Sequence, residues 1–145
     1  MAPAGGRRVA LTGVRSFPGA PLLSRLEGSE VWDEVLTFDI LPPPPSTRGP
    51  HVKVDLTNLE SDRVMAEALR EHRVDTFVHL AYLSYPTHDA SWGHELEAIG
   101  TIRVLDACAE AGIAHFIAVS TTAVYGAAPS NPAFLTENAP LKGKS

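Results

Sequence analysis

The chain has 145 residues, of which 44% are hydrophobic, and a formal net charge of −5 at pH 7. Its length and composition fit one domain with a core, and the acidic balance without a basic tract argues against a nucleic-acid partner, because neutralising phosphates needs clustered Lys and Arg. No stretch approaches about 18 apolar residues, so we expect no membrane partner. The N-terminus lacks a signal-peptide pattern, and the single cysteine, Cys108, fits a reducing compartment, so we expect a cytoplasmic protein.

Apolar segments of strand length alternate with segments of helical periodicity, which is typical of βαβ units and a parallel sheet. Gly112 follows the longest helical segment, where a helix end commonly takes a left-handed residue. The run Pro42 to Pro45 cannot continue a strand or a helix and predicts a stiff loop, with recognition by a proline-binding partner as the alternative. The predicted strands are 8–11, 34–40, 51–54, 74–80 and 115–119, and the predicted helices are 18–26, 58–70 and 91–111.

Small, hydroxyl-bearing residues and glycines directly follow two of these strands. The first strand runs into Thr12-Gly13-Val14-Arg15-Ser16-Phe17-Pro18-Gly19, and the fifth runs into Ser120-Thr121-Thr122-Ala123-Val124-Tyr125-Gly126. Ligands of an open parallel sheet bind outside the carboxyl ends of its strands, so we expect both segments to face one crevice. The first segment is suited to a pyrophosphate, because a helix N-terminus offers unpaired N–H groups and a favourable dipole. The second would present hydroxyl groups to a substrate.

Together these segments resemble the extended short-chain dehydrogenase/reductase family, the NAD-dependent sugar epimerases and dehydratases. That family reads Thr-Gly-x-x-Gly-x-x-Gly at the first site and Ser-Ser/Thr-x-x-Val-Tyr-Gly at the second. The resemblance covers nearly the whole chain and departs at Ser16, where the family has its middle glycine. It implies a Rossmann-type, doubly wound α/β fold with parallel strand order 3-2-1-4-5, truncated before the sixth strand. It also implies NAD as cofactor and a small-molecule substrate, frequently a nucleotide-linked sugar.

The first two strand ends are expected to hold most of the cofactor. Asp39 ends the second strand, where an acid accepts hydrogen bonds from both adenosine ribose hydroxyls and repels a 2′-phosphate, so NAD is expected over NADP. The alternative for Asp39 is a solvated carboxylate at a strand end. In the first turn, the resemblance implies cofactor contacts from Gly13, Arg15, Ser16, Phe17 and Gly19.

Further cofactor positions rest on the resemblance alone. Asp55-Leu56 matches an Asp-Leu pair that contacts the adenine ring in the family, with a turn acid near a helix start as the alternative. His79-Leu80-Ala81 resembles the family's His-Leu-Ala-Ala segment, whose backbone lines the cofactor, so Leu80 and Ala81 are implied. Tyr82 replaces the second alanine, and we expect His79 itself to be a packed, hydrogen-bonded core residue. Glu97 replaces the asparagine of an Asn-Val-x-Gly-Thr segment.

Thr121 is the candidate catalytic residue. It lies four residues before Tyr125 and matches the family's hydroxyl that hydrogen-bonds the reacting oxygen of the substrate; a structural role for a strand-end threonine is the alternative. The family's catalytic Tyr-x-x-x-Lys should follow, but neither Lys142 nor Lys144 has a tyrosine four residues before it. We therefore expect the chain alone to be inactive.

These observations predict residues 1–126 to be an NAD-binding Rossmann domain and residues 127–145 to be a loop leading to an absent catalytic and substrate-binding region. The leading interpretation is the cofactor-binding part of an NAD-dependent epimerase/dehydratase. A non-catalytic dinucleotide-binding module, either a sensor or a scaffold, is the alternative, and a protein-interaction domain on the same fold is a third. Because a sixth strand is lacking, the fifth strand is predicted to be an apolar edge, and the partners expected are another copy of the chain in a homo-oligomer or another protein that associates through this edge.

Overall fold

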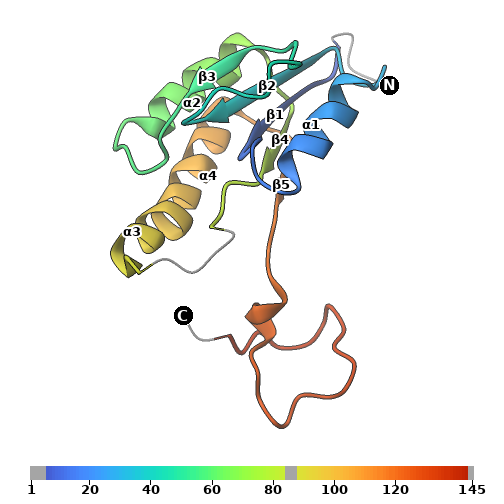
Figure 1. Ribbon diagram of the computed structural model, residues 1–145, viewed down its shortest axis with the longest axis vertical. Coiled ribbons are helices and arrows are strands. Elements are labelled where there is room, and N and C mark those ends of the chain that lie inside the picture. Colours follow the sequence, from blue (N-terminus) through green and yellow to red (C-terminus); the bar gives the residue numbers. More distant parts are fainter. Residues whose placement is uncertain (1–5, 84–87, 144–145) are drawn as a thin grey trace.

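The fold is a parallel sheet between helices in a computed structural model that describes residues 6–83 and 88–143 (Figure 1). Within these residues, five strands form one sheet in which every neighbouring pair is parallel. Their order is β3-β2-β1-β4-β5, which confirms the predicted Rossmann-type topology. The strands are β1 Arg8–Thr12, β2 Glu34–Asp39, β3 His51–Lys53, β4 Thr76–His79 and β5 His115–Ala118.

The three predicted helical segments are present, two of them with differences. The long segment is continuous but contains a π-helical turn, η1, between two α-helical parts. The second helix begins at Ser61 rather than near Asn58, because the Asn58 side chain accepts a hydrogen bond from the N–H of Glu60 in a turn before the helix. The helical elements are α1 Gly19–Glu27, α2 Ser61–Glu71, α3 Ala90–His94, η1 Glu95–Ile99, α4 Gly100–Ala111 and the short 3₁₀ helix η2 Thr122–Tyr125.

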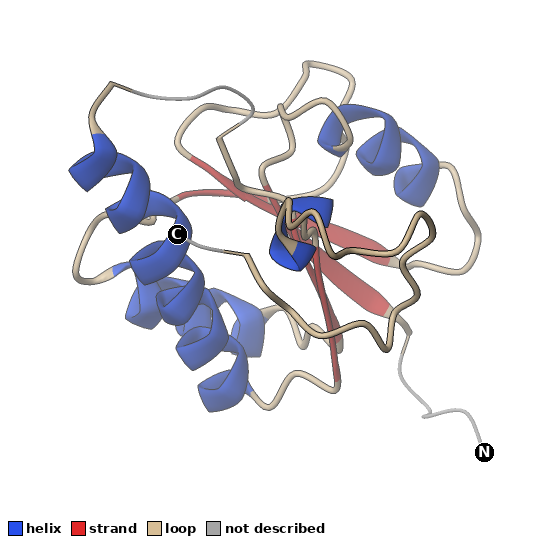
Figure 2. Cartoon of the chain, turned by 90° about the horizontal axis from the view of Figure 1, so that it is seen from below, coloured by secondary structure: helices blue, strands red, loops and turns tan. Residues whose placement is uncertain are grey.

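Helices α2 and α4 pack side by side on one face of the sheet, and α1 packs on the other (Figure 2). Successive side chains of a strand point to opposite faces of the sheet. A strand that is covered by helices on both faces is therefore apolar at every position. On the α2/α4 face, the rings of Phe38, Phe77 and Phe116 stack across β2, β4 and β5 with centroids 6.1 and 6.0 Å apart. On the α1 face, Leu23 packs with residues of β1 and β2. No helix in the described part of the chain is long and apolar enough to span a membrane.

The edge strand β5 is covered by helices on one face only, whereas Val78 of the neighbouring β4 is buried on the α1 face. Ile117 of β5 pairs in register with Val78 of β4 and so points to the α1 face, yet Ile117 is 55% exposed and Val119 is 45% exposed. Residues 127–143 form no helix or strand, and they extend away from the sheet rather than over this surface (Figure 1). In the described sheet, β5 is therefore an apolar edge strand, and association through it stays a prediction.

Two glycines with left-handed backbone conformation, Gly13 and Gly112, differ in the space that surrounds them. Replacing each by alanine tests how much the close approach in the β1–α1 turn contributes to stability. Gly13 has φ +66°, and a Cβ there would lie 2.5 Å from the backbone of Leu80. Gly112 has φ +73°, but a Cβ there would meet nothing within 4 Å. Gly112→Ala should cost about 1–2 kcal/mol for the left-handed backbone alone, whereas Gly13→Ala should cost about 2–5 kcal/mol because overlap with backbone is added.

Urea denaturation followed by circular dichroism measures both free energies of unfolding. Equal losses in the two variants would show that the close approach of Gly13 to β4 is not a structural constraint.

Candidate functional site

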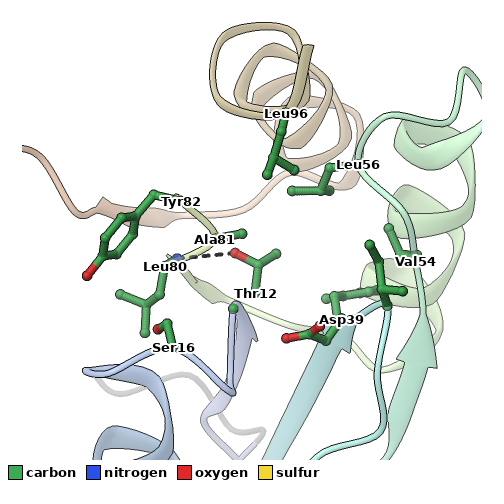
Figure 3. A pocket seen from close by; sticks show the side chains of 12 residues that line it. Thr12, Ser16, Asp39, Val54, Leu56, Leu80, Ala81, Tyr82 and Leu96 are labelled. Carbon is green, nitrogen blue, oxygen red and sulfur yellow. Dashed lines mark hydrogen bonds between the residues drawn. The ribbon is translucent and has the colours of Figure 1, made fainter. Parts of the chain in front are cut away.

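Two cavities lie along the carboxyl ends of the strands, and they share Ala81 and Tyr82 as lining residues. The first, of about 230 Å³, lies over β1, β2 and the segment after β3 (Figure 3). The second, of about 700 Å³, lies over the ends of β4 and β5. Because they share a wall, we treat them as one strand-end groove that crosses the sheet. Both motif segments of the sequence line this groove, through Thr12, Gly13 and Ser16 at one end and through Ser120, Thr121 and Thr122 at the other.

Two glycines fix the turn that forms the floor of the first cavity. A Cβ at Gly13 would overlap the backbone of Leu80 and Ala81, so the turn approaches the end of β4 more closely than any side chain allows. A Cβ at Gly19 would lie 2.2 Å from the carbonyl oxygen of Gly13, so α1 starts directly against the same turn. Glycine at both positions is what brings β1, β4 and α1 together at this point.

The hydrogen bonds of Ser16 change what the helix N-terminus can offer. Its Oγ accepts from the N–H of Gly19 at 3.2 Å, and its carbonyl oxygen accepts from Gly19 and Ala20 at 3.0 and 3.4 Å. The next residue, Pro21, has no N–H. The expectation that the start of α1 supplies unpaired N–H groups is therefore wrong for these three positions. The amides of Arg15 and Phe17 have no hydrogen-bond partner among the described residues, so they are among the N–H groups of the turn left for an anion.

Asp39 and Leu56 both line the first cavity, as the sequence predicts for cofactor contacts. The Asp39 side chain points toward the cavity (Figure 3), and its Oδ1 accepts from the N–H of Leu41 at 3.3 Å. Asp55 does not line the cavity; its Oδ1 accepts from the N–H and the hydroxyl of Thr57 at 2.9 and 2.7 Å. These contacts are those of an acid that stabilises a turn, which was the alternative interpretation of Asp55.

The remaining predicted cofactor residues divide between the cavities and the surface. Leu80 lines the first cavity, and Ala81 lines both cavities. Three predicted residues line neither cavity: Arg15, Phe17 and Gly19. The Arg15 guanidinium donates to the carbonyl oxygen of Pro42 at 2.9 Å and so ties the proline loop to the turn. Phe17 is 91% exposed.

Thr121 lines the second cavity, with Ser120 and Thr122 beside it. Its Oγ1 accepts from the N–H of Ala123 at 3.2 Å and caps the short helix η2. A capping hydroxyl keeps its own hydrogen free to donate, so this structural role leaves Thr121 able to donate to a substrate oxygen.

Several groove residues were not predicted as site residues. Leu96 and Glu97 are neighbours on the π-helical turn, and Leu96 lines the first cavity while Glu97 lines the second. The Glu97 carboxylate accepts from the N–H of Leu83 at 2.9 Å. The departure of Glu97 from the family's asparagine was the sequence signal for this position. No cluster of three or more His, Cys, Asp or Glu in the described part of the chain is arranged to hold a metal ion.

His79 lies beneath the groove and joins three elements through its ring. The Thr101 hydroxyl donates to the carbonyl oxygen of Glu97, so toward His79 Nε2 at 3.1 Å it must accept, and Nε2 carries the proton. Nδ1 then accepts from the Thr12 hydroxyl at 2.7 Å, and Thr12 Oγ1 accepts from the N–H of Leu80 at 3.2 Å (Figure 3). Burial lowers the pKa of His79 to about 4, which keeps the ring neutral. The expectation of a packed, hydrogen-bonded histidine is confirmed.

The family follows from a comparison with known proteins. A model described as the NAD dependent epimerase/dehydratase family matches residues 9–145. The chain belongs to this family. The resemblance inferred from the two motif segments is confirmed, and NAD is the cofactor on which the family depends.

Relatives of this family member are longer than the chain. An uncharacterized protein of Mycobacterium tuberculosis (strain H37Rv) is 29% identical over 138 residues, which cover 90% of this chain and 36% of the relative. A short-chain dehydrogenase/reductase superfamily protein from Agrobacterium tumefaciens with bound NAD has 26% identity and a TM-score of 0.74, covering 96% of this chain and 40% of that one. MoeE5, in complex with UDP-glucuronic acid and NAD, has 26% identity and a TM-score of 0.72, and the match covers 96% of this chain and 43% of MoeE5. The chain spans about two fifths of the length of these relatives.

The groove of this family member fits its cofactor. The turn at Gly13 packs directly on the backbone that follows β4, which is the tight turn made by the first glycine of a pyrophosphate-binding loop. At the second position of that loop, Ser16 lines the first cavity. A carboxylate at one end and hydroxyl groups at the other match the ribose and the reacting end of a dinucleotide.

The neutral state of His79 should make the stability of the chain depend on pH. Because the pKa of His79 falls from 6.5 to about 4 on folding, the unfolded chain takes up a proton in this range and the folded chain does not. The free energy of unfolding should fall as the pH falls through this range, with His79 contributing at most about 3 kcal/mol. In His79→Gln, an amide replaces the ring and this contribution is lost.

Urea denaturation at several pH values gives the slopes to compare. The variant should show a flatter pH dependence than the wild-type chain, whatever its absolute stability. Parallel curves for the two proteins would contradict a neutral, buried His79.

Ser16→Gly should tighten NAD binding by about two- to tenfold. The substitution removes a Cβ from the cavity lining and removes one of the acceptors on the N–H of Gly19. Ser16→Ala keeps the Cβ and should give a smaller gain. Isothermal titration calorimetry measures both, and a weaker NAD complex in Ser16→Gly would mean that the serine hydroxyl itself binds the phosphate.

Proposed function

We propose that this chain is the NAD-binding part of an epimerase or dehydratase that transfers a hydride at a hydroxyl-bearing carbon of a small molecule. The observation that carries the proposal is the strand-end groove, which joins Asp39 to Thr121 past the glycine turn. These parts follow the order of a dinucleotide: an acid for a ribose, a tight turn with backbone amides for the pyrophosphate, and hydroxyl groups at the reacting carbon.

The residues of the groove take distinct roles in this proposal. Asp39 accepts hydrogen bonds from the adenosine ribose, and Leu56 packs on the adenine. The turn at Gly13 holds the pyrophosphate with its free amides. Thr121 donates its hydroxyl hydrogen to the reacting oxygen of the substrate and so orients the carbon that loses hydride. In this proposal the adenosine end of NAD takes the first cavity and the nicotinamide end takes the second. When bound, NAD supplies the hydride acceptor.

A nucleotide-linked sugar is the substrate class that the comparison supports best. MoeE5, of similar fold, was solved with UDP-glucuronic acid as well as NAD. The second cavity offers the hydroxyls of Ser120, Thr121 and Thr122 to a polyhydroxylated ligand, and hydroxyl groups serve as both donors and acceptors toward sugars. The parts of the longer relatives that this chain does not span would complete the substrate site and supply the acid and base.

The second candidate is a dinucleotide-binding module without catalysis. It is favoured by the side chain of Ser16 in the pyrophosphate turn. Both candidates bind NAD, and they differ in the need for Thr121. In a protein that joins this chain to the remaining length of a relative, loss of turnover with unchanged NAD affinity in Thr121→Ala would favour the enzyme.

The proposed role of Asp39 predicts the choice of cofactor. NAD should bind at least about tenfold more tightly than NADP, because the carboxylate repels a 2′-phosphate. Asp39→Asn keeps the size of the side chain and removes its charge, so it should narrow this difference by about tenfold. Calorimetric titration of both cofactors into both proteins measures the difference.

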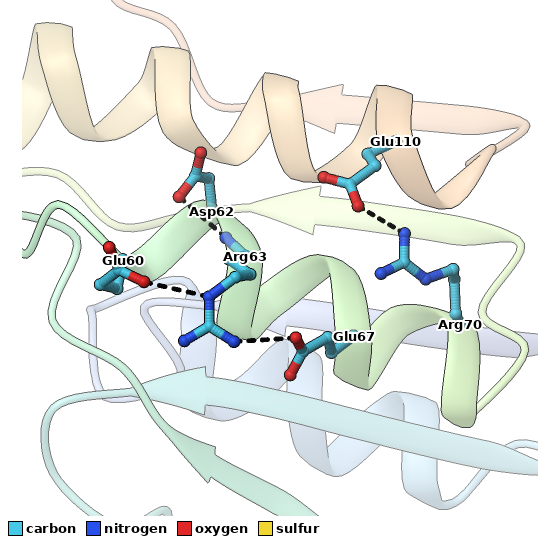
Figure 4. Close-up of polar contacts among 6 residues, drawn as sticks. All are labelled: Glu60, Asp62, Arg63, Glu67, Arg70 and Glu110. Atoms are coloured by element: carbon cyan, nitrogen blue, oxygen red, sulfur yellow. Dashed lines mark hydrogen bonds and ion pairs between the residues drawn. The ribbon is translucent and has the colours of Figure 1, made fainter.

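Asp62→Asn is the matched control, because Asp62 lies on α2 beside the exposed ion pairs of Arg63 and away from the groove (Figure 4). This variant should keep the wild-type preference. An Asp39→Asn variant that also kept it would remove Asp39 from the ribose site.

A further inference from the structure

The second cavity contains a carboxylate that the proposed function does not use. Glu97 lines this cavity together with Ser120 and Thr121. One carboxylate oxygen, Oε1, accepts from the N–H of Leu83 at 2.9 Å. Where the family has a neutral asparagine, this chain therefore holds a negative charge at the nicotinamide end of the groove.

The segment that carries Glu97 is fixed by contacts to two other parts of the molecule. The hydroxyl of Thr101 bonds the Glu97 carbonyl oxygen and the His79 ring, which ties the π-helical turn to β4. The Arg103 guanidinium bonds the Glu95 carboxylate at 2.7 Å and the Leu56 carbonyl oxygen at 2.8 Å. These bonds tie the same turn to the segment after β3. Glu97 is exposed, but its backbone is held in place, so its charge stays at the cavity.

No opposite charge balances this carboxylate at the cavity wall. Among the described residues that line the second cavity, none is Lys or Arg. The only titratable cation among them is His79, whose lowered pKa keeps it neutral. The local field at this end of the groove is therefore set by Glu97 and is negative.

We propose that Glu97 makes the site discriminate between the two redox forms of the cofactor, binding oxidised NAD⁺ in preference to NADH. The oxidised nicotinamide ring carries a positive charge that the reduced ring lacks, while the rest of the two molecules is the same. A carboxylate beside this ring stabilises the oxidised form and leaves the reduced form unaffected by this charge. The inference rests on the proposed function, which puts the nicotinamide in the second cavity.

The ratio of the dissociation constants of NADH and NAD⁺ tests the proposal directly in the chain as it is. Glu97→Gln keeps an acceptor for the N–H of Leu83 and removes only the charge. Because Glu97 is exposed and its interaction is screened by water, the variant should lower the ratio by about two- to fivefold. The effect should shrink in about 1 M salt, where the Debye length is roughly 3 Å. Titration calorimetry for NAD⁺ and quenching of nicotinamide fluorescence for NADH give the two constants.

Glu110→Gln is the matched control. Glu110 lies on the same continuous helical segment, near the end of α4, where it pairs with Arg70 at 2.6 Å and lines neither cavity (Figure 4). It loses the same charge and should keep the wild-type ratio. Glu97→Ala, which also loses the bond to Leu83, should lower the ratio as much as Glu97→Gln, because the charge and not the hydrogen bond sets the preference.

The outcomes separate this inference from the proposed function. If the wild-type chain binds both forms and Glu97→Gln leaves their ratio unchanged, or weakens both equally, the inference is overturned and the proposed function stands. If the folded wild-type chain binds neither form, the proposed function itself is overturned. A ratio that falls in Glu97→Gln and not in Glu110→Gln supports the inference.

Discussion

The contact between the β1–α1 turn and the end of β4 is the constraint on which the rest of the groove depends. Gly13 brings the two backbones closer than any other residue allows. The Thr12 hydroxyl then bridges them, since it accepts from the N–H of Leu80 and donates to the ring of His79. Because β1 lies at the centre of the sheet, this junction positions the first cavity on one side and the second on the other. A change at the junction would displace both ends of a bound dinucleotide together.

The order of the strands and the place of the groove could be predicted because they depend on patterns that repeat along the chain. Buried parallel strands are continuous apolar runs, and a glycine after such a run marks the tight turn. Where a role was predicted wrongly, a side chain hydrogen-bonds a nearby backbone N–H group that the prediction had left free. Ser16 and Asn58 bond nearby N–H groups instead of leaving them free for an anion or starting the helix, and Asp55 does the same in its turn. Short polar side chains have several such partners within reach, so sequence alone does not choose among them.

The π-helical turn is the other feature that the sequence did not reveal. The periodicity of the long helical segment is nearly regular, and one wider turn changes which face its residues present. In the structure this turn brings Leu96 to the first cavity and Glu97 to the second. The identity of Glu97 was therefore visible in the sequence as a departure from the family, but its position on the groove required the fold.

The charges along the groove lead to one further consequence for how it holds a dinucleotide. Asp39 lies at one end and Glu97 at the other, and among the described residues that line the two cavities there is no Lys or Arg. The negative pyrophosphate must therefore be stabilised by backbone amides and by the dipole of α1. Since Ser16 and Pro21 reduce the amides available in the first turn of that helix, the free N–H groups of Arg15 and Phe17 carry more of this task. The bond from the Arg15 guanidinium to the Pro42 carbonyl oxygen ties this part of the turn to the proline loop.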